Sequence, residues 1–350
     1  MLAETARKAL VATLVAGAVV ILALALWKLK LVISLVFLGF IIAAAMRPGV
    51  EALYRRRIPR GIGIGIHYAA LLGLVALFLW LVVPRAVTQV QNALNADQLR
   101  HATRTSSGIK HEILLGLQKR LERVPSGSKL IKPAAEVTKR AFEAILGIFF
   151  TLATAAYWIF ERDRAINLVA SLVPRPKRKR LRDTWDLIDL KLGAFVRGQA
   201  LLIVLVGTVL STAFALIGLP YWLLVGSFAG LVEMVPVIGP LAAGALAIGV
   251  GFTQSWHVGL AAGVVVLLVR LLEDYLILPK VLGEATGLSP LVVLFSVSAV
   301  AILFGGFAVL LAVPLAAVVA TLVDVVVRGR DPAEEEVPTV LFPAKDAEEV

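Results

Sequence analysis

The sequence predicts an all-α, polytopic integral membrane protein with about eight membrane segments, some of them broken or re-entrant helical hairpins in the C-terminal half. The first observation is composition: of 350 residues, 59% are hydrophobic and 17% are charged, and the mean hydropathy is +0.89. Soluble domains carry about 25% charged residues. The second observation is that apolar residues gather in runs long enough to cross a bilayer core of about 30 Å. The third is that two of these runs exceed one span and are interrupted by prolines or a glycine pair, as in transporters.

Four apolar runs in the first half are each expected to cross the membrane once. They are Ala9 to Leu26, Leu29 to Met46, Ile62 to Val83 and Phe142 to Phe160. The first two predict a helical hairpin joined near Trp27 and Lys28, because an aromatic ring and a cation suit the interface. A signal peptide with Ala23-x-Ala25 at its cleavage site is the alternative for the first run, but a second apolar run follows at once. Residues 1–83 are therefore predicted to form a three-span helical bundle.

Residues 84–140 are polar and contain no run long enough to cross a membrane. Leucine and isoleucine recur there at helical spacing, at Ile113, Leu114, Leu117 and Leu121, which favours amphipathic helices. We expect an extramembrane segment here, and it is the best candidate for a contact between subunits of a homo-oligomer.

A basic loop and an interfacial helix are expected after the fourth span, within a unit of residues 141–199. Cations are densest from Pro174 to Arg180. The positive-inside rule explains them, so we expect no nucleic-acid partner. Residues 181–199 predict a helix lying in the membrane surface. Its apolar Leu187, Leu190 and Phe195 would lie opposite Asp186, Asp189 and Lys191.

Residues 200–327 are predicted to form a C-terminal transport core. Its segments are Leu201 to Leu219, Tyr221 to Phe252, Val258 to Leu278 and Leu291 to Val327. The second would make a helix of about 48 Å, but Glu233 to Pro240 interrupts it, because two prolines remove backbone donors. The last is interrupted at Gly305, Gly306 and Pro314.

Charge predicts the orientation and the character of the tail. The loops Arg47 to Arg60 and Arg162 to Arg182 are rich in cations, and the spans counted between them are even in number. Both loops and the N-terminus are therefore expected to face the cytoplasm. Residues 328–350 are acidic and have little apolar pattern, which predicts a disordered tail.

Several function classes are disfavoured by the residues present. The sequence has no cysteine, and its four histidines show no ligand spacing, so we expect no metal site and no cofactor. It contains no Walker A motif, which argues against ATP-driven transport within this chain. Ser227 follows Gly226, but no histidine is placed to activate it, and we predict that the protein is not an enzyme.

Short stretches between residues 160 and 315 resemble, in order and spacing, the autoinducer-2 exporter (AI-2E) family of bacterial and archaeal permeases. They are Phe160-Glu161-Arg162-Asp163, Phe195-Val196-Arg197-Gly198-Gln199, Gly218-Leu219-Pro220, Val235-Pro236-Val237-Ile238-Gly239-Pro240, Glu273-Asp274-Tyr275-Leu276-Ile277-Leu278-Pro279-Lys280-Val281-Leu282-Gly283, Gly287-Leu288-Ser289-Pro290 and Leu311-Ala312-Val313-Pro314. Four residues depart from the family pattern. Ser289 stands in place of a histidine, Val300-Ala301 replaces a glycine pair, and Ala308 replaces a glycine.

The resemblance implies a multi-pass transporter of the cell membrane, a homo-oligomer such as a pentamer, with hairpins in its second half that do not fully cross. Some members of the family are associated with export of autoinducer-2, and others are proposed to be sodium or proton antiporters. Its partners would be membrane lipid and a small polar solute or an ion.

The first helix break supplies the candidate pathway residues. A carboxylate at membrane depth costs roughly 2.5 kcal/mol or more, so Glu233 is expected to face protein or water. It would contact a cation, a proton or a polar solute; the alternative is simple hydration at an interface. Pro236, Gly239 and Pro240 would line the pathway with freed backbone groups, or else only join two packed half-helices.

A charged cluster supplies the remaining candidates. Arg270, Glu273 and Asp274 lie at i, i+3 and i+4, on one helical face, with one carboxylate in excess. They form either part of the ion pathway or an interfacial salt bridge. The supporting residues are Arg197, Gln199, Arg270, Gly305, Gly306 and Pro314. Arg197 would pin a mobile helix or touch phospholipid.

These features predict a permease or exporter that moves a small polar solute or an ion by alternating access. A sodium or proton antiporter is the first alternative. A membrane scaffold that transports nothing is the second.

Overall fold

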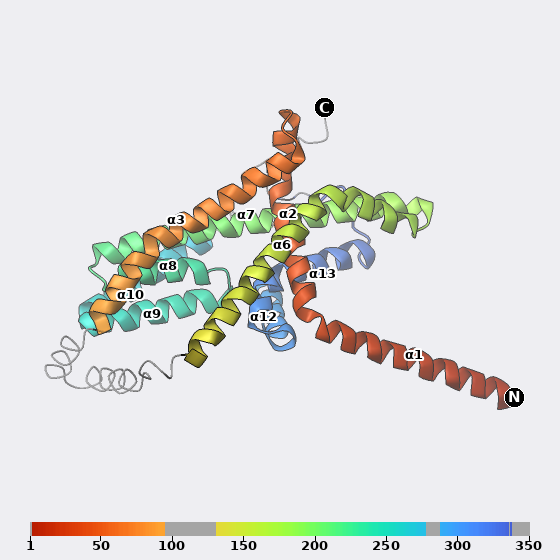
Figure 1. The fold of residues 1–350 in the computed structure, drawn as a ribbon, viewed down its shortest axis with the longest axis horizontal. Helices are drawn as coiled ribbons and strands as arrows, with labels where there is room; N and C mark the ends of the chain where they lie inside the picture. Colours follow the sequence, from red (N-terminus) through yellow and green to blue (C-terminus); the bar gives the residue numbers. More distant parts are fainter. Residues whose placement is uncertain (1, 95–130, 278–287, 336, 338–350) are drawn as a thin grey trace.

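A computed structural model describes residues 2–94, 131–277, 288–335 and 337. Within these ranges every regular element is a helix and no strand occurs, which confirms the predicted all-α class (Figure 1). Six described helical segments are long and apolar enough to cross a membrane. They are Leu10–Lys28, Lys30–Arg55, Arg60–Arg85, Lys139–Ser171, Arg175–Leu216 and Gly306–Val326.

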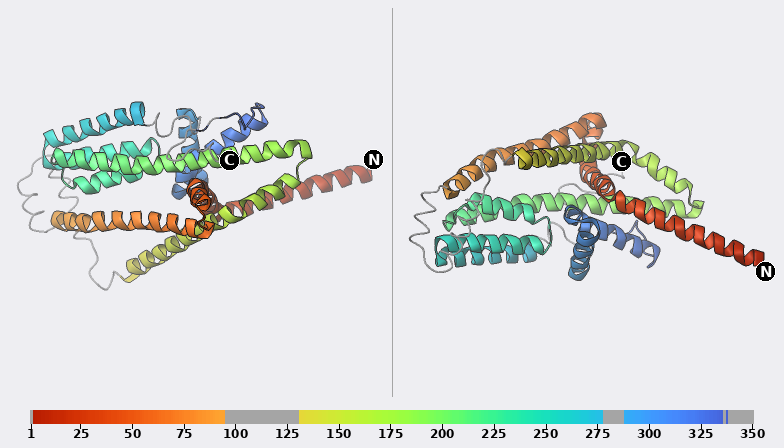
Figure 2. Two further views of the ribbon diagram at one scale, coloured as in Figure 1. Left: turned by 90° about the horizontal axis from the view of Figure 1, so that it is seen from above. Right: turned by 60° about the horizontal axis from the view of Figure 1, so that its bottom comes forward.

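The first two helices do not form the predicted hairpin. Helix α1 (Leu2–Lys28) extends away from the other helices instead of folding back along α2 (Lys30–Arg55), as Figures 1 and 2 show. The reason is local. No glycine, proline or asparagine separates the two helices, and helical hydrogen bonds continue across Leu29, whose N–H donates to Ala25 O and whose O accepts from Ile33 N.

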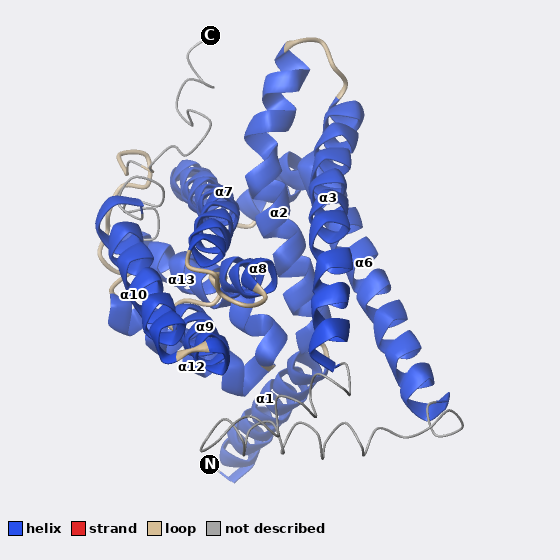
Figure 3. Ribbon diagram, turned by 90° about the vertical axis from the view of Figure 1, so that its left-hand side faces the viewer, coloured by secondary structure: helices blue, strands red, loops and turns tan. Residues whose placement is uncertain are grey.

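Helices α2, α3 (Arg60–Leu94) and α6 (Ile131–Ser171) lie on one side of the molecule, where α2 and α6 also contact α7 (Figure 3). The Tyr68 hydroxyl of α3 donates to Leu152 O of α6 at 2.5 Å. The predicted extramembrane segment 84–140 is described only at its helical ends, and residues 95–130 lie outside the described residues.

Helix α7 (Arg178–Leu216) follows a short 3-10 turn at Arg175–Lys177 and is continuous. The sequence predicted an interfacial helix and a separate span here, but no proline or turn interrupts the chain. The predicted solvent face is also wrong. Asp189 and Lys191 are both buried, because α2, α6 and α13 pack around the first half of α7.

Helices α8 (Trp222–Val232), α9 (Ile238–Gln254) and α10 (Trp256–Leu272) follow one another back and forth beside the second half of α7 (Figure 2). An eleven-residue helix is about 16 Å long, so α8 is too short to cross a bilayer core of about 30 Å. A glycine allows α7 and α8 to approach closely: a Cβ at Gly226 would lie 2.5 Å from Ser211 Cα. Small residues in this role are usual between membrane helices.

The last membrane region is also broken. Helix α12 (Pro290–Phe304) ends at Gly305, whose φ of 92° favours glycine, and a 3-10 segment (Gly306–Leu311) leads into α13 (Ala312–Val326). Ser289, which departs from the family pattern, caps α12: its Oγ accepts from Val292 N at 3.4 Å.

The first part of the predicted disordered tail lies against α7. Lys191 Nζ donates to Glu335 Oε1 at 2.6 Å and to Thr321 Oγ1 of α13 at 3.3 Å. Residues 338–350 lie outside the described residues, so disorder of the tail as a whole stays a prediction.

Candidate functional site

The predicted break between α8 and α9 contains a strained backbone turn. Val237 has φ 67° and ψ −53°, and Ile238 N donates to Pro236 O at 2.7 Å. This is the rare, strained form of the γ-turn. A β-branched residue at positive φ is an outlier, and such strain costs on the order of 1–3 kcal/mol and concentrates at functional sites.

We predict that Val237→Gly raises thermal stability. Glycine removes the strain, and its own entropic cost is only about 0.5–1 kcal/mol. Little packing is lost, because Val237 is 45% exposed. The midpoint of thermal unfolding of the detergent-solubilised chain should rise by about 2 °C. The control is Val264→Gly, at an exposed position of the regular helix α10, which should lower the midpoint. A lower midpoint in both variants would mean that Val237 carries no strain.

Gly239 is required by close backbone approach. A Cβ at this position would lie 1.9 Å from Val232 O and 2.6 Å from Val232 C. The Gly239 N–H donates to Val235 O at 2.8 Å, which ties the start of α9 to the turn before it. Pro240 lies in the first turn of α9, where the missing N–H costs nothing.

Gln199 of α7 stabilises the same break from the side. Its amide Nε2 donates to Glu233 O at 3.0 Å, and both residues are buried. The last carbonyls of a helix lack intrahelical donors, so this bond satisfies an acceptor that would otherwise be unpaired in an apolar environment.

The main feature of the site is an ion cluster that joins the break to the end of α10. Arg270 Nη1 lies 3.1 Å from Glu233 Oε1 and 3.2 Å from Glu273 Oε2, and Arg270 Nη2 lies 2.9 Å from Asp274 Oδ1. The sequence placed Arg270, Glu273 and Asp274 together. The structure adds Glu233, which is 37 positions away in the sequence.

The charges of this cluster do not balance. The side chains of Glu233 and Glu273 are 8% and 3% exposed, whereas those of Arg270 and Asp274 are 33% and 41% exposed. One guanidinium therefore faces three carboxylates, two of them buried. Two buried carboxylates that share one cation repel each other, and a proton, a cation or a cationic solute group would lower that repulsion.

The helix changes type where the cluster lies. Helix α10 passes at Leu272 into a π-helical turn, Glu273–Ile277, which carries two of the three carboxylates. Single π-turns within helices are frequent at functional sites. Residues 278–287, which include much of the longest matching stretch, lie outside the described residues.

The other predicted residues lie outside the cluster. Arg197 is half-buried, and its Nη1 donates to Ala45 O of α2 at 3.2 Å. Gly305, Gly306 and Pro314 form the second break. That region contacts the first break through Val235, which packs against the apolar cluster of α12 and α13.

Two further features were missed by the sequence reasoning. One is an ion network that joins α2, α6 and α7: Arg162 of α6 bonds both Asp186 and Asp189, and Arg47 Nη1 lies 3.7 Å from Asp189 Oδ2. The charges of Asp186 and Asp189 are visible in the sequence, but the helical pattern predicted that both side chains would face solvent. The other is a cavity of about 600 Å³ between α2, α6, α7 and α13, whose lining residues are scattered along the chain.

Comparisons with known proteins agree on one family. Residues 16–328 match the family model described as "AI-2E family transporter". The chain is 27% identical over 312 residues to "Putative transport protein YrrI" of Bacillus subtilis, covering 82% of this chain and 86% of the relative. It is 24% identical over 331 residues to "Putative transport protein MT0215" of Mycobacterium tuberculosis, covering 89% and 88%. It is 25% identical over 208 residues to "Putative permease PerM" of Escherichia coli, covering 55% and 57%.

Proposed function

The chain belongs to the AI-2E family of membrane transporters, and on that premise we propose that it moves a small polar solute or an ion by alternating access. The solute or ion would bind at the cluster of Glu233, Arg270, Glu273 and Asp274. Signalling molecules of the autoinducer-2 type are among the candidate solutes. The observation that supports this proposal most strongly is the excess of carboxylates, two of them buried, at a proline-broken helix.

The backbone of the break supports the same role. Broken membrane helices expose backbone groups that are tolerated only where they are buried in protein or line a wet cavity. Glu233 O is held by Gln199, and the N–H groups at the start of α9 are held by Val235 O and Pro236 O. The site is thus rigid on the backbone side, and its side chains carry the exchangeable charge.

The bonds of Arg270 suggest how the site could open alternately to the two sides of the membrane. Arg270 is the one residue in the described chain that bonds both Glu233 on the break and Glu273 and Asp274 on the π-helical turn. A cation or proton on Glu233 would weaken its bond to Arg270 and free the end of α8 to move relative to α10. Two discrete pairings of one arginine would supply the two states that alternating access needs.

A sodium or proton antiporter is the second candidate, and the charge imbalance favours it. A buried carboxylate could pair with a fixed arginine in one state and bind a cation in the other. Its charge would then be compensated in both states. In this version of the proposal, the transported species is the cation itself.

We further propose an orientation and an assembly. Loops 47–60 and 161–182, together with the N-terminus, would face the cytoplasm of a bacterial or archaeal cell, because their cations obey the positive-inside rule. The chain would form a homo-oligomer such as a pentamer. The exposed apolar surface of α1, for example Leu14 at 65% and Ile21 at 70% exposure, supports contacts with lipid or with neighbouring subunits.

The experiment is a flux assay in liposomes containing the full-length chain. We predict that Glu233→Gln slows flux of the transported species at least about tenfold, the equivalent of about 1.4 kcal/mol. The reason is that glutamine has no carboxylate that could bind and release a proton or pair with a cation. Sodium, protons, autoinducer-2 and other small polar solutes are screened in turn, and Asp274→Asn is measured alongside.

The matched control is Glu51→Gln, which also removes a carboxylate bonded to an arginine. Glu51 lies in α2, outside the helices that carry the cluster, and pairs with Arg60 at 3.3 Å. Its flux should equal that of the wild type. Equal flux in Glu233→Gln would remove the site assignment and keep the transport proposal. Wild-type liposomes that behave like empty ones for every solute would instead favour the scaffold alternative.

A further inference from the structure

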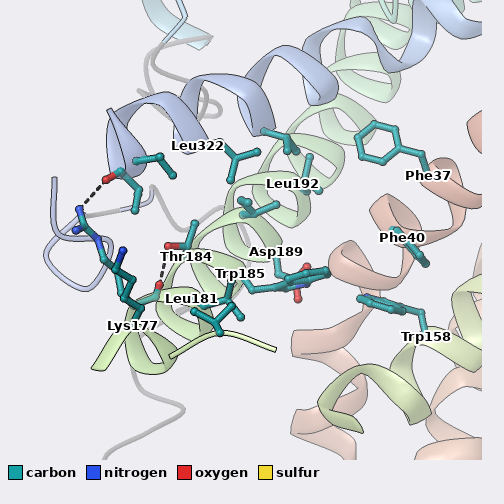
Figure 4. Close-up of a pocket in the computed structure, with 16 residues that line it drawn as sticks. Phe37, Phe40, Trp158, Lys177, Leu181, Thr184, Trp185, Asp189, Leu192 and Leu322 are labelled. Atoms are coloured by element: carbon teal, nitrogen blue, oxygen red, sulfur yellow. Dashed lines mark hydrogen bonds between the residues drawn. The ribbon is translucent and has the colours of Figure 1, made fainter. Parts of the chain in front are cut away.

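The cavity between α2, α6, α7 and α13 is distinct from the charge cluster and has two chemically different ends. Its volume of about 600 Å³ lies in the range of roughly 300–1,000 Å³ that is usual for sites of small organic ligands. Figure 4 shows Phe37, Phe40 and Trp158 at one end and Lys177 at the other.

The interior of the cavity is aromatic and aliphatic. The rings of Phe40 and Trp158 have their centroids 4.2 Å apart, and Trp158 and Trp185 follow at 5.9 Å. Leu192 and Leu322 complete the apolar wall (Figure 4). The Thr184 hydroxyl donates to Arg180 O at 2.6 Å, so its donor is already used. A cavity of this kind excludes water and favours an apolar chain.

The polar residues of the lining leave a net positive mouth. The carboxylate of Asp189 accepts from Arg162 Nε at 2.5 Å and faces Arg47 at 3.7 Å, so its charge is compensated. Arg180 Nη2 donates to Val325 O at 2.6 Å, which fixes its guanidinium beside α13. Lys177 makes no ion pair among the described residues and is exposed.

The walls place the cavity in one half of the membrane. Phe37 and Phe40 lie in the uncharged stretch of α2 between Lys30 and Arg47, and Trp158 lies in α6 three residues before Glu161. Phe37 is ten residues, or about 15 Å, from Arg47, the first charged residue that follows it. That is about half of a 30 Å bilayer core, the depth that one acyl chain of one leaflet reaches.

We propose that this cavity binds an anionic phospholipid of the leaflet that contacts loop 161–182. The phosphate group would lie at Lys177 and Arg180, and one acyl chain would extend between α2, α6 and α13 to Phe37. The bound lipid would fill the space between the first half of α7 and the membrane spans, and it would hold the basic loop at the membrane surface.

The test uses the two tryptophans of the cavity as reporters. Trp27, Trp80, Trp222 and Trp256 are replaced by phenylalanine in the full-length chain, which leaves Trp158 and Trp185. The protein is reconstituted in phosphatidylcholine vesicles, and phosphatidylglycerol with brominated acyl chains is titrated in. We expect saturable quenching of fluorescence at lower mole fractions than with brominated phosphatidylcholine.

The matched pair of variants is Lys177→Gln and Lys179→Gln. Both remove one lysine from the same basic run, but only Lys177 lines the cavity. An ion pair at an exposed site contributes up to about 1 kcal/mol, so loss of the pair between Lys177 and the lipid phosphate should weaken the phosphatidylglycerol interaction about fivefold. Lys179→Gln should leave it unchanged, because Lys179 does not line the cavity. Equal effects of the two variants, or equal quenching by the two lipids, would overturn the proposal.

Two further arms separate the lipid from other occupants. Leu322→Phe, at a half-exposed position of the wall, should reduce quenching by filling the cavity without changing its charge. Inorganic phosphate should not relieve quenching, because it lacks the acyl chain. Relief by phosphate alone would show a free-anion site at the mouth and would remove the acyl-chain part of the proposal.

Discussion

Replacing Arg270 with glutamine is expected to destabilise the protein by about 3–5 kcal/mol, the usual cost of removing one partner from a buried ion pair. Among the described residues, the guanidinium is the one cation bonded to Glu233 and Glu273, and both carboxylates are buried. The midpoint of thermal unfolding of the purified chain should fall by about 6–10 °C, taking roughly 2 °C per kcal/mol.

The control for this prediction is Arg328→Gln. Arg328 also pairs with an aspartate at i and i+4 spacing, at 2.7 Å from Asp324 Oδ1, but its side chain is 63% exposed. Exposed pairs contribute about 0–1 kcal/mol, so its midpoint should change by no more than about 2 °C. Equal losses in the two variants would show that the cluster is solvated.

A second substitution distinguishes charge from packing. Adding Glu273→Gln to Arg270→Gln removes one of the unpaired carboxylates and should restore part of the stability. Glu273→Gln alone should cost little, because the wild-type cluster has more carboxylates than cations. No recovery in the double variant would mean that Arg270 acts through the packing of its methylene groups.

The sequence predicted the break and three of the four residues of the cluster for identifiable reasons. Pro236 and Pro240 cannot continue a helix, so α8 and α9 separate where the pattern indicated. Arg270, Glu273 and Asp274 lie within one turn, and spacing along a helix is a local property. The bond from Arg270 to Glu233 is not local: it depends on α8, α9 and α10 folding back beside α7, which no periodicity encodes.

The sequence did not predict the burial of charged residues whose ion-pair partners lie far away along the chain. Asp189 and Lys191 have the spacing of a solvated helical face, but the fold gives each a charged partner, Arg162 of α6 and Glu335 of the tail. Charged residues that are fully buried are almost always paired, and the pairing partner lies 27 or 144 positions away. Hydropathy alone assigns such residues to water.

The second large effect is expected from Gly239→Ala. The added Cβ would lie 1.9 Å from Val232 O, a distance at which two heavy atoms cannot coexist, so the end of α8 and the start of α9 must separate. Overpacking usually costs about 1–3 kcal/mol because side chains yield. Here the Cβ clashes with a backbone oxygen, and no side-chain rotation can separate the two atoms, so the cost should reach or exceed the upper end of that range.

Separation of the two helix ends should have a specific consequence at the charge cluster. Glu233 follows Val232 directly and is held by Gln199 through its carbonyl, so a shift of Val232 moves the carboxylate away from Arg270. Gly239→Ala should therefore impair flux even where enough folded protein is recovered for the assay, and adding Glu233→Gln to it should cause little further loss of flux.

The matched control for this prediction is Gly249→Ala on the same helix. A Cβ at Gly249 meets no atom within 4 Å, and alanine is favoured over glycine within a helix by roughly 0.5–1 kcal/mol. This variant should be slightly more stable than the wild type and equally active. If Gly239→Ala matched it in thermal midpoint and flux, α8 and α9 would not approach as closely as the structure shows, and Glu233 would not depend on the glycine for its position beside Arg270.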